Sequence, residues 1–345
     1  MSTLWTINLN MNDYEEDAVS LLRRQFICLA GAAAGAAILP RRAWPQTQTY
    51  PSRLIKIVVP FPAGGPTDLM GRMAAQHLSS SLGQNVVVEN VVGAAGMIGA
   101  QAVARADPDG YTLLLGGTSN AISAALYKKP GYDPVRDFAP IASLAVESDA
   151  LLVHPSVPVK TIQEFLDYAK ANPGKITCGA TTGVMPHVMV AFFMVRSATS
   201  MVFVPYRGAA QTITDLLSGH IQMTLGAKAS YLPHVQTGKL RALAVTSEAR
   251  WAELPDVPTM RDSGFTDFPA YQWFGLLAPA KTPAAVIGKL NATINNGLSS
   301  AELGASLAKL GLEAKIQTPQ ELQQLLLAES REWDAIVKAA GIKID

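Results

Sequence analysis

An alternation of apolar strands, glycine-rich turns and helices constrains the fold of this chain more than any other feature. Ile55 to Pro60 is apolar and mostly β-branched, which predicts a strand, and a helix follows from about Asp68 to Leu82. The same order continues with a strand at Val86 to Glu89, a helix at Ile98 to Ala106 and a strand at Tyr111 to Leu115. Strand–helix–strand order with right-handed crossovers predicts a parallel sheet.

A second α/β unit is predicted after about residue 150. Its first helix runs from Thr161 through Ala171, with Thr161 as the N-cap and Glu164 three residues later. We expect two lobes, residues 50–148 plus 275–345 and residues 149–274, joined by two crossing strands near residues 148 and 274, with the C-terminal helices returning to the first lobe. Ligands bind between such lobes. The further predicted elements are Ile176–Cys178, Val184–Met194, Val202–Val204, Thr212–Leu217, Ile221–Thr224, Leu240–Val245, Phe274–Ala278, Pro283–Leu298 and Pro319–Ala340.

The composition fits two well-packed domains and excludes several functional classes. The chain has 345 residues, which is too long for the usual single domain. Hydrophobic residues make up 49% and charged residues 16%, so a large core can form and disorder is excluded. The formal net charge of +1, without a basic stripe, argues against nucleic-acid binding.

The first 45 residues resemble a targeting segment. Arg23 and Arg24 precede Phe26-Ile27 and an alanine- and glycine-rich apolar run, and Arg41 follows the run. This pattern predicts a secretory signal of the twin-arginine type, carried on an N-terminal extension and removed after export to the periplasm. The alternative is a membrane anchor, but the 16 residues between Arg24 and Arg41 fall short of the ~20 that span a bilayer.

Two glycine-rich turns share a design that suits anion binding. Pro62-Ala-Gly-Gly65 and Gly93-Ala-Ala-Gly96 each follow a predicted strand and precede a predicted helix. Peptide N–H groups at a helix N-terminus are unpaired and the helix dipole favours an anion there, while glycine lets a ligand approach the backbone. Both turns together could hold one carboxylate; the alternative is that they are ordinary connections. Asp68 either caps its helix or holds the Gly64-Gly65 loop in shape.

No enzymatic or metal-binding constellation is evident in the sequence. The five histidines lack metal-ligand spacing, and there is no nucleophile elbow and no dinucleotide or phosphate-loop fingerprint, so no cofactor or metal is expected. His187 joins a predicted strand to a helix at the expected edge of the ligand site, or is a structural histidine of the second lobe. A hydrolase or isomerase using Asp68 and His187 remains as an alternative function.

A series of motifs carries a family resemblance from residue 50 to residue 342. They are Tyr50-Pro-Ser-Arg, Ile57-Val-Val-Pro-Phe-Pro-Ala-Gly-Gly-Pro-Thr-Asp68, Val88-Glu-Asn90, Asp109-Gly-Tyr-Thr-Leu113, Tyr132-Asp-Pro-Val-Arg-Asp-Phe138, Asn172-Pro-Gly174, Val204-Pro-Tyr-Arg-Gly208, Gly238-Lys-Leu-Arg-Ala-Leu-Ala-Val245, Leu254-Pro-Asp-Val-Pro258 and Trp273-Phe-Gly-Leu-Leu-Ala-Pro279. With these motifs the chain resembles the receptors of tripartite tricarboxylate transporters, also called Bug proteins.

The resemblance implies a fold, a function and a site. The fold would be the two-lobed periplasmic binding protein fold, type II-like, with two crossing hinge strands. The function would be capture of a small organic carboxylate outside the cytoplasm and its delivery to membrane permease subunits. Both turns would hold the first carboxylate through main-chain amides and water, and the facing lobe would set specificity. The predicted ligand-binding residues are Phe61, Ala63, Gly64, Gly65, Asp68, Gly93, Ala94, Ala95, Gly96, Thr118 and Ser119 on lobe one, and Thr181, Thr182, His187, Tyr206, Arg207 and Lys228 on lobe two.

The chain departs from the family pattern at two places within the predicted site. The second turn has Ala95 where the family usually has glycine, which predicts a narrower or reshaped turn. An Asp-Asn pair of the family is replaced by Gly226-Ala-Lys228, and we expect Lys228, in a loop after the strand Ile221 to Thr224, to bind a second anionic group of the ligand. The alternative is a solvated surface lysine. A role as the sensor of a signalling pathway is a further alternative to transport.

Overall fold

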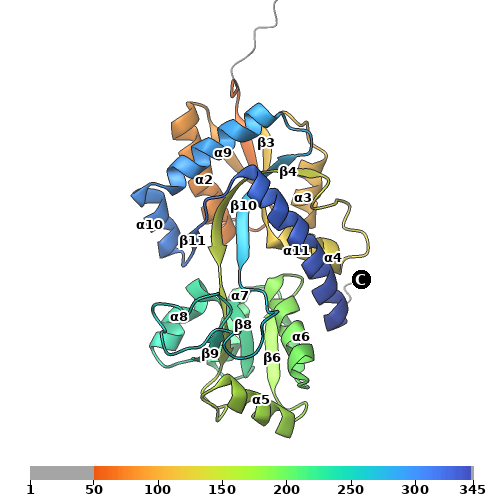
Figure 1. Cartoon of the computed structure of the whole chain (residues 1–345), viewed down its shortest axis with the longest axis vertical. Coiled ribbons are helices and arrows are strands. Elements are labelled where there is room, and N and C mark those ends of the chain that lie inside the picture. Colours follow the sequence, from red (N-terminus) through yellow and green to blue (C-terminus); the bar gives the residue numbers. More distant parts are fainter. Residues whose placement is uncertain (1–49, 343–345) are drawn as a thin grey trace, which may run out of the picture. The chain divides into compact units, whose positions relative to one another are not determined.

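The structure is a computed structural model that describes residues 50–342, and it contains two β-sheets (Figure 1). The six-stranded sheet has the order β11-β4-β10-β3-β1-β2. Strands β1, β2 and β3 are parallel, as the sequence predicts, and β10 and β4 extend the sheet in antiparallel fashion. The strands are β1 Ile55–Val59, β2 Val86–Asn90, β3 Thr112–Gly117, β4 Phe138–Glu147, β10 Gln272–Pro279 and β11 Glu313–Ala314.

The second sheet has five strands in the order β7-β6-β8-β5-β9. Strands β6, β7 and β8 are parallel, whereas β5 is antiparallel to both of its neighbours. Strand β5, which lies between β8 and β9, is buried along its whole length, because helices cover both faces of the sheet. The strands are β5 Asp149–Val153, β6 Thr177–Thr181, β7 Val202–Tyr206, β8 Met223–Ala227 and β9 Arg241–Val245.

The chain passes between the two sheets twice. Strand β4 of the first sheet leads into β5 of the second with only Ser148 between them, and the return lies between β9 and β10. In Figure 1, β4 and β10 lie side by side in the upper lobe and connect it to the lower lobe. The predicted fold class, two α/β lobes with two crossings, is therefore confirmed. The predicted targeting segment lies outside the described residues.

Three helices of lobe one, α2, α3 and α4, begin at the edge where the parallel strands end. Helix α2 has proline at its first position and ends at Gly83, whose φ of 65° fits a glycine C-cap. A short 3₁₀ turn, η2, leads directly into α3. Helix α4 was not predicted, because its polar start hides the helical pattern. The bounds are α2 Pro66–Leu82, η2 Ala94–Gly96, α3 Met97–Ala104, α4 Thr118–Leu126, α9 Ala284–Leu298 and α10 Ala301–Lys309.

The helices of lobe two surround the second sheet. The hydroxyl of Thr161 accepts a hydrogen bond from the N–H of Glu164, 3.2 Å away, which confirms the predicted N-cap. Helix α6 carries much of the core, including Phe193, and buries nearly all of its apolar side chains. The bounds are α5 Ile162–Ala171, α6 Met185–Ser197, α7 Ala209–Leu217 and α8 Lys228–Gln236.

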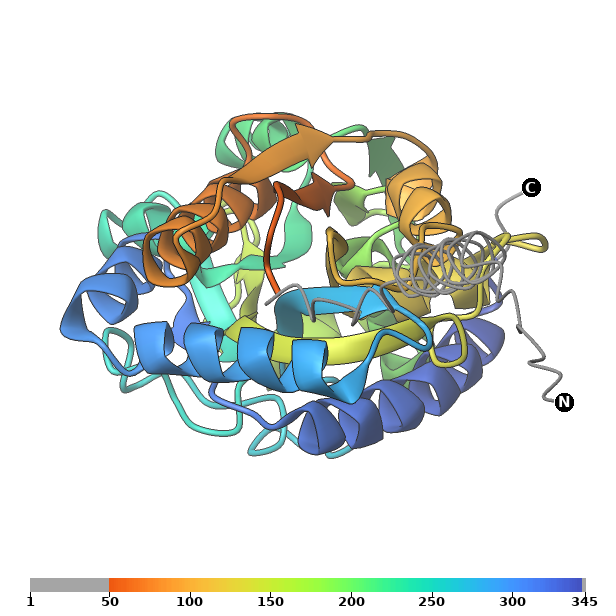
Figure 2. The same cartoon turned by 90° about the horizontal axis from the view of Figure 1, so that it is seen from above.

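The last helix, α11 Pro319–Ala340, packs against both lobes. Leu322 and Leu326 join a core cluster of lobe one. Trp333 and Ile336 instead join the cluster that contains the α6 side chains of lobe two. Seen from above, α9 and α11 run along the outer side of β4 and β10 (Figure 2). The C-terminal segment therefore connects the lobes rather than serving lobe one alone.

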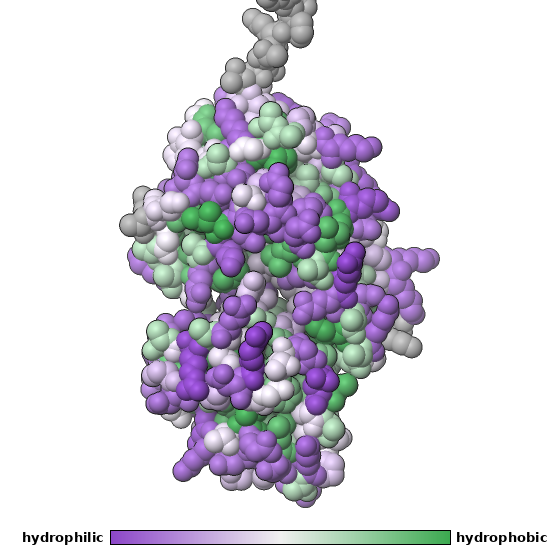
Figure 3. Space-filling view, in the orientation of Figure 1, coloured by the Kyte–Doolittle hydropathy of each residue, from purple (hydrophilic) through white to green (hydrophobic). Residues whose placement is uncertain are grey.

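The surface of the described residues is mainly polar. On the face shown in Figure 3, hydrophilic residues predominate and apolar residues form small separate patches. Scattered apolar residues of this kind are normal on a folded protein. None of the helices within residues 50–342 has the length and hydropathy that crossing a bilayer requires.

Candidate functional site

Three chain segments leave the parallel strands of lobe one at the same edge of the sheet. Residues 61–65 follow β1, residues 91–96 follow β2, and Gly117 leads β3 into α4. The first two segments touch, because a Cβ atom on Gly96 would lie 3.4 Å from the Pro60 side chain and 3.5 Å from the Phe61 ring. Helix N-termini at the carboxyl edge of parallel strands are where α/β proteins bind anions. We call this set of segments the backbone edge.

The carboxylate of Asp68 supports the first turn from inside. One oxygen accepts hydrogen bonds from the N–H of Gly64 at 2.9 Å and from Nε of Arg72 at 2.8 Å. The other accepts from Nδ2 of Asn90 at 2.9 Å, and Asn90 also donates to the carbonyl of Phe61 at 3.0 Å. The hydrogen bond from Arg72, above all, lowers the pKa of Asp68 to about 2. Of its two predicted roles, this geometry favours that of holding the loop.

The second turn has an unusual backbone conformation. Four consecutive residues have positive φ: Gly93 at 135°, Ala94 at 46°, Ala95 at 52° and Gly96 at 91°. A left-handed conformation is costly for alanine but not for glycine, at roughly 1–2 kcal/mol per residue. Ser123 of α4 stabilises the turn by donating to the carbonyl of Ala95 at 3.1 Å. The departure of Ala95 from the family pattern therefore falls on a residue where glycine would be unstrained.

The two turns differ in what their glycines require. Gly64 has a φ of 82°, so a side chain there would be strained. Gly65 has a φ of −79°, and the nearest atom to a Cβ on it is the Pro62 carbonyl oxygen at 3.5 Å. A larger residue at Gly65 would thus act through the space that it takes from a ligand, not through backbone strain.

The third segment begins with Gly117 and Thr118. A Cβ atom on Gly117 would lie 2.1 Å from the carbonyl oxygen of Trp273, so only glycine lets β3 approach β10 this closely. The hydroxyl of Thr118 donates to Glu329 at 2.9 Å and accepts from the N–H of Trp273 at 3.1 Å. This leaves the main chain of Thr118 and Ser119, at the start of α4, for the predicted ligand contact.

On lobe two, predicted residues lie at the carboxyl edge of the parallel strands β6 and β7. Thr181 ends β6 and Tyr206 ends β7, and the N–H of Thr182 donates to the carbonyl of Tyr206 at 3.0 Å. The Tyr206 hydroxyl donates to Asp215 at 2.6 Å. Arg207 is exposed and has no hydrogen-bond or ion-pair partner in the part of the chain that the structure describes. It is therefore the cation at this edge that is free to meet an anion.

His187 lies near the start of α6 and has a structural environment. Its ring stacks on Phe203 with centroids 4.7 Å apart, and the N–H of Gly183 donates to its Nδ1 at 3.4 Å. Burial lowers the pKa of His187, so its imidazole is neutral at neutral pH. The hydrogen-bond partners of Asp68 are Gly64, Arg72 and Asn90, so no Asp68–His187 pair supports an enzymatic site. Residues 50–342 contain no cluster of three metal-ligating side chains.

Lys228 does not have the surroundings that we expected from the sequence. It is the first residue of α8 and not part of a loop, because the strand β8 runs directly into the helix. Its Nζ is 3.0 Å from a carboxylate oxygen of Glu253 and 5.4 Å above the Trp251 ring, with 14% of the side chain exposed. It lines a cavity of about 520 Å³ that contains no other predicted site residue. Lys228 therefore lies neither in the predicted loop nor on the surface as a solvated lysine, but at a helix start, paired with Glu253.

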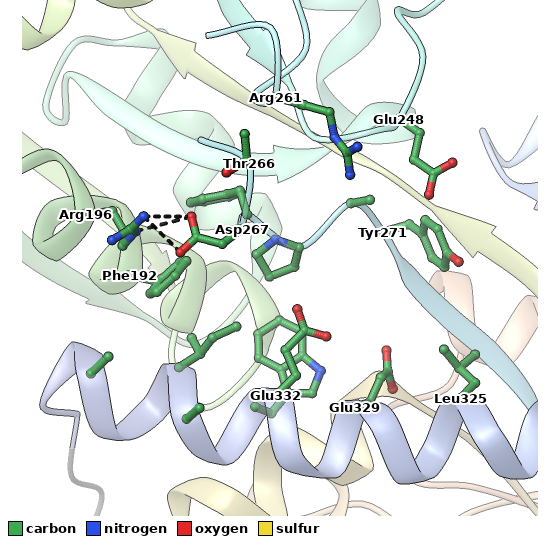
Figure 4. Close-up of a pocket in the computed structure, with 17 residues that line it drawn as sticks. Phe192, Arg196, Glu248, Arg261, Thr266, Asp267, Tyr271, Leu325, Glu329 and Glu332 are labelled. Atoms are coloured by element: carbon green, nitrogen blue, oxygen red, sulfur yellow. Dashed lines mark hydrogen bonds and ion pairs between the residues drawn. The ribbon is translucent and has the colours of Figure 1, made fainter. Parts of the chain in front are cut away.

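A second cavity, of about 580 Å³, lies between α6, residues 261–271 and α11 (Figure 4). Glu329 and Glu332 project into it from α11, while Arg261 and Tyr271 face them from the other side. Burial raises the pKa of Glu329 to about 7. Glu329 is not among the predicted site residues, although an acidic residue on the apolar stripe of a predicted helix was a signal for it.

Comparisons with known proteins agree with the fold. The family model described as "Tripartite tricarboxylate transporter family receptor" matches residues 70–342. The chain is similar to Protein BugT of Bordetella pertussis, with 34% identity over 92% of this chain and 96% of that protein.

Three solved structures are similar as well. The structure of a periplasmic transporter has a TM-score of 0.76 and 37% identity over 86% of this chain and all of that one. A structure from R. palustris with adipate has a TM-score of 0.76 and 33% identity, covering 85% and 99% of the two chains. MatC from Rhodopseudomonas palustris with bound malate has a TM-score of 0.73 and 30% identity, covering 84% and 100%.

Proposed function

Because the chain belongs to the tripartite tricarboxylate transporter receptor family, we propose that it captures a small dicarboxylate between its lobes and delivers it to membrane permease subunits. The family consists of solute-binding receptors and not of enzymes. The observation that carries the proposal is the backbone edge, where three helix-starting segments meet at the ends of β1, β2 and β3. Their main-chain N–H groups hold the first carboxylate of the ligand.

The two lobes divide the work of recognition in this proposal. The backbone edge supplies dipoles that suit a carboxylate of any parent molecule. On lobe two, the unpartnered guanidinium of Arg207 takes the distal carboxylate, and Thr181, Thr182 and Tyr206 shape the space between. The similar structures with adipate and malate support a dicarboxylate as the class of ligand. Lys228 would contribute only if it left Glu253.

We place the protein in the periplasm, delivered by the predicted twin-arginine signal and released when that segment is removed. The likeness to a periplasmic transporter structure supports this location, and the family supports the permease partner. The two crossings at Ser148 and before Gln272 would act as the hinge on which the lobes close over the ligand.

A thermal-shift screen of carboxylates, followed by calorimetry, tests the proposal. Adipate and malate are the first probes and their diamides are the matched controls, because an amide keeps the length of the ligand but removes both anions. A ligand at 100 times its Kd adds about 2.7 kcal/mol of stability, which a melting curve resolves. Stabilisation by diacids and not by diamides is the expected result. No shift with any dicarboxylate, or conversion of a probe to product, would overturn the proposal.

A further inference from the structure

Glu329 of α11 joins a buried hydrogen-bond network that none of the predicted roles accounts for. One carboxylate oxygen accepts from the Thr118 hydroxyl at 2.9 Å, and the other accepts from the indole N–H of Trp273 at 2.6 Å. The Thr118 hydroxyl in turn accepts from the main-chain N–H of Trp273 at 3.1 Å. All three residues are less than one-tenth exposed. The three side chains therefore form one closed network.

This network joins α11 to two other parts of the molecule, α4 beside the backbone edge and the start of β10. Thr118 is the first residue of α4, and Ser123 of the same helix supports the second turn through the carbonyl of Ala95. Trp273 lies at the start of β10, where the chain returns from lobe two, and its carbonyl lies against Gly117. Any displacement of Glu329 would thus be passed on both to the backbone edge and to a crossing strand.

The surroundings of Glu329 leave its charge uncompensated by a direct ion pair. The charge of Glu332, one turn along α11, contributes to the raised pKa of Glu329. The charge of Glu329 in turn contributes to the raised pKa of Tyr271, just before β10. Across the cavity lie Glu248 and Arg261, while Arg196 of α6 is paired with Asp267 at 3.0 Å (Figure 4). Because burial raises the pKa of Glu329 to about 7, its protonation changes within the physiological range.

We propose that Glu329 is a positioning residue for ligand binding, which holds α4 and the start of β10 in the arrangement that the ligand requires and makes affinity depend on its protonation state. This inference rests on the proposed function. The ionised carboxylate accepts hydrogen bonds from the Thr118 hydroxyl and from the Trp273 indole at once. The protonated form donates its own O–H to the Thr118 oxygen, so the Thr118 hydroxyl hydrogen must point elsewhere. Affinity therefore falls as the pH is lowered through about 7.

The first test requires no ligand. In the full-length chain, the indole N–H signal of Trp273, identified with Trp273→Phe, shifts with pH around a midpoint near 7 because its acceptor titrates. Glu329→Gln keeps the size of the side chain but cannot ionise, so the titration disappears. A Trp273 signal that titrates equally in both proteins, or in neither, would overturn the coupling.

The second test measures affinity for adipate between pH 6 and pH 8.5. The affinity of Glu329→Ala for adipate is tenfold or more below that of the wild type at pH 8. The affinity of Glu329→Gln does not change with pH and equals that of the wild type at pH 6. Glu332→Ala is the matched control, because Glu332 lies one turn away on the same helix, and it stays within twofold. Equal effects of the Glu329 and Glu332 variants would reduce Glu329 to a structural residue.

The two tests also separate this inference from the proposed function. If adipate and the other carboxylates fail to bind the wild type, the proposed ligand class is wrong, while the indole titration still decides whether Glu329 is coupled to Trp273. If Glu329→Ala does not fold, the affinity of Glu329→Gln for adipate between pH 6 and pH 8.5 serves as the test. A Gln variant with the wild-type pH profile would contradict the proposal.

Discussion

The carboxyl edges of the parallel strands in the two lobes differ in how completely their polar groups are engaged in hydrogen bonds. On lobe one, the side chains around the backbone edge are already paired: Asp68 with Gly64, Arg72 and Asn90, and Thr118 with Glu329. On lobe two, Arg207 has no partner among the described residues. A fixed edge can present the same main-chain groups to every ligand, whereas an edge with a free side chain can discriminate. This difference is the reason why we propose general carboxylate recognition for lobe one and specificity for lobe two.

The largest expected effect comes from valine at Gly96. Its φ of 91° is strained for any side chain, and the new atoms would press on Pro60 and Phe61 as well as on the ligand, so carboxylate binding should be undetectable by calorimetry. Gly65→Val is the matched comparison, because φ is −79° there and only the ligand space is lost. Its circular dichroism and melting temperature should stay close to wild type. Near-normal affinity in both variants would break the backbone-edge account.

The position of the glycine-rich turns on lobe one could be predicted from the sequence, whereas the side-chain contacts that support them could not. Glycine-rich turns between a strand and a helix are local features, so their position at a shared edge follows from the parallel sheet. The pairing of Asp68 with Asn90 depends on the register of β1 and β2, and the Glu329–Thr118 contact joins residues 211 apart in sequence. Such contacts are set by tertiary packing, which periodicity does not reveal.

The predicted loop at Lys228 is wrong, and the sequence shows why a helix is hard to predict there. Pro233 lies inside α8, and this helix has no clearly apolar face. The helix α4 was missed in the same way, since it opens with Thr118, Ser119 and Asn120, polar residues that are more typical of caps and turns. Element type was predictable where the helical spacing of apolar residues continues over several turns, as in the long helices α2 and α11.

The next largest effect is a loss of stability as pH rises. It tests whether the first crossing, unlike the two edges, contains buried carboxyl groups that stay protonated. Burial raises the pKa of Glu147 to about 8 and that of Asp149 to about 7, and neither carboxylate oxygen of Asp149 has a hydrogen-bond partner within residues 50–342. Folded pKa values above the unfolded ones mean that the stabilisation is complete below about pH 4 and is lost as pH rises through 7 to 8.

Urea unfolding between pH 5 and pH 8.5 measures this loss. The free energy of unfolding should fall by a few kcal/mol, at about 1.4 kcal/mol per unit of pKa shift. Asp149→Asn removes one ionisable group without changing its size, so its curve should be flatter than that of the wild type. The matched control is Asp262→Asn, at an exposed residue with a lowered pKa. Identical slopes for the wild type and Asp149→Asn would contradict the assignment.

A smaller effect is expected from Arg207→Met, which sharpens the assignment of specificity to lobe two. Methionine keeps a long apolar side chain but removes the cation, so a dicarboxylate should lose about tenfold in affinity while the corresponding monocarboxylate loses little. Lys228→Met is the control, because Lys228 is already paired with Glu253. If Lys228→Met loses more affinity for the same dicarboxylate than Arg207→Met does, the distal carboxylate is bound at Lys228 instead.

The smallest expected effect is a gain in stability from Ala95→Gly. Ala95 has a φ of 52°, and glycine removes the strain of a left-handed alanine, which amounts to about 1 kcal/mol after the loss of chain entropy is allowed for. Thermal unfolding of the ligand-free protein reports the change. Ala63→Gly, in the first turn, is the comparison and should be neutral or slightly destabilising. A destabilised Ala95→Gly would mean that the second turn depends on the Ala95 side chain.

Amide NMR during titration with the carboxylate that gives the largest thermal shift tests the central claim most directly. We expect downfield shifts of the main-chain N–H protons of Gly65 and Ser119, because a carboxylate oxygen accepts hydrogen bonds at the backbone edge, whereas the N–H groups of Gly64 and Gly96 already donate to Asp68 and to the Gly93 carbonyl. The same signals should not move with the matched amide. Saturable binding with those amide signals unchanged, and perturbations confined to lobe two, would contradict the account.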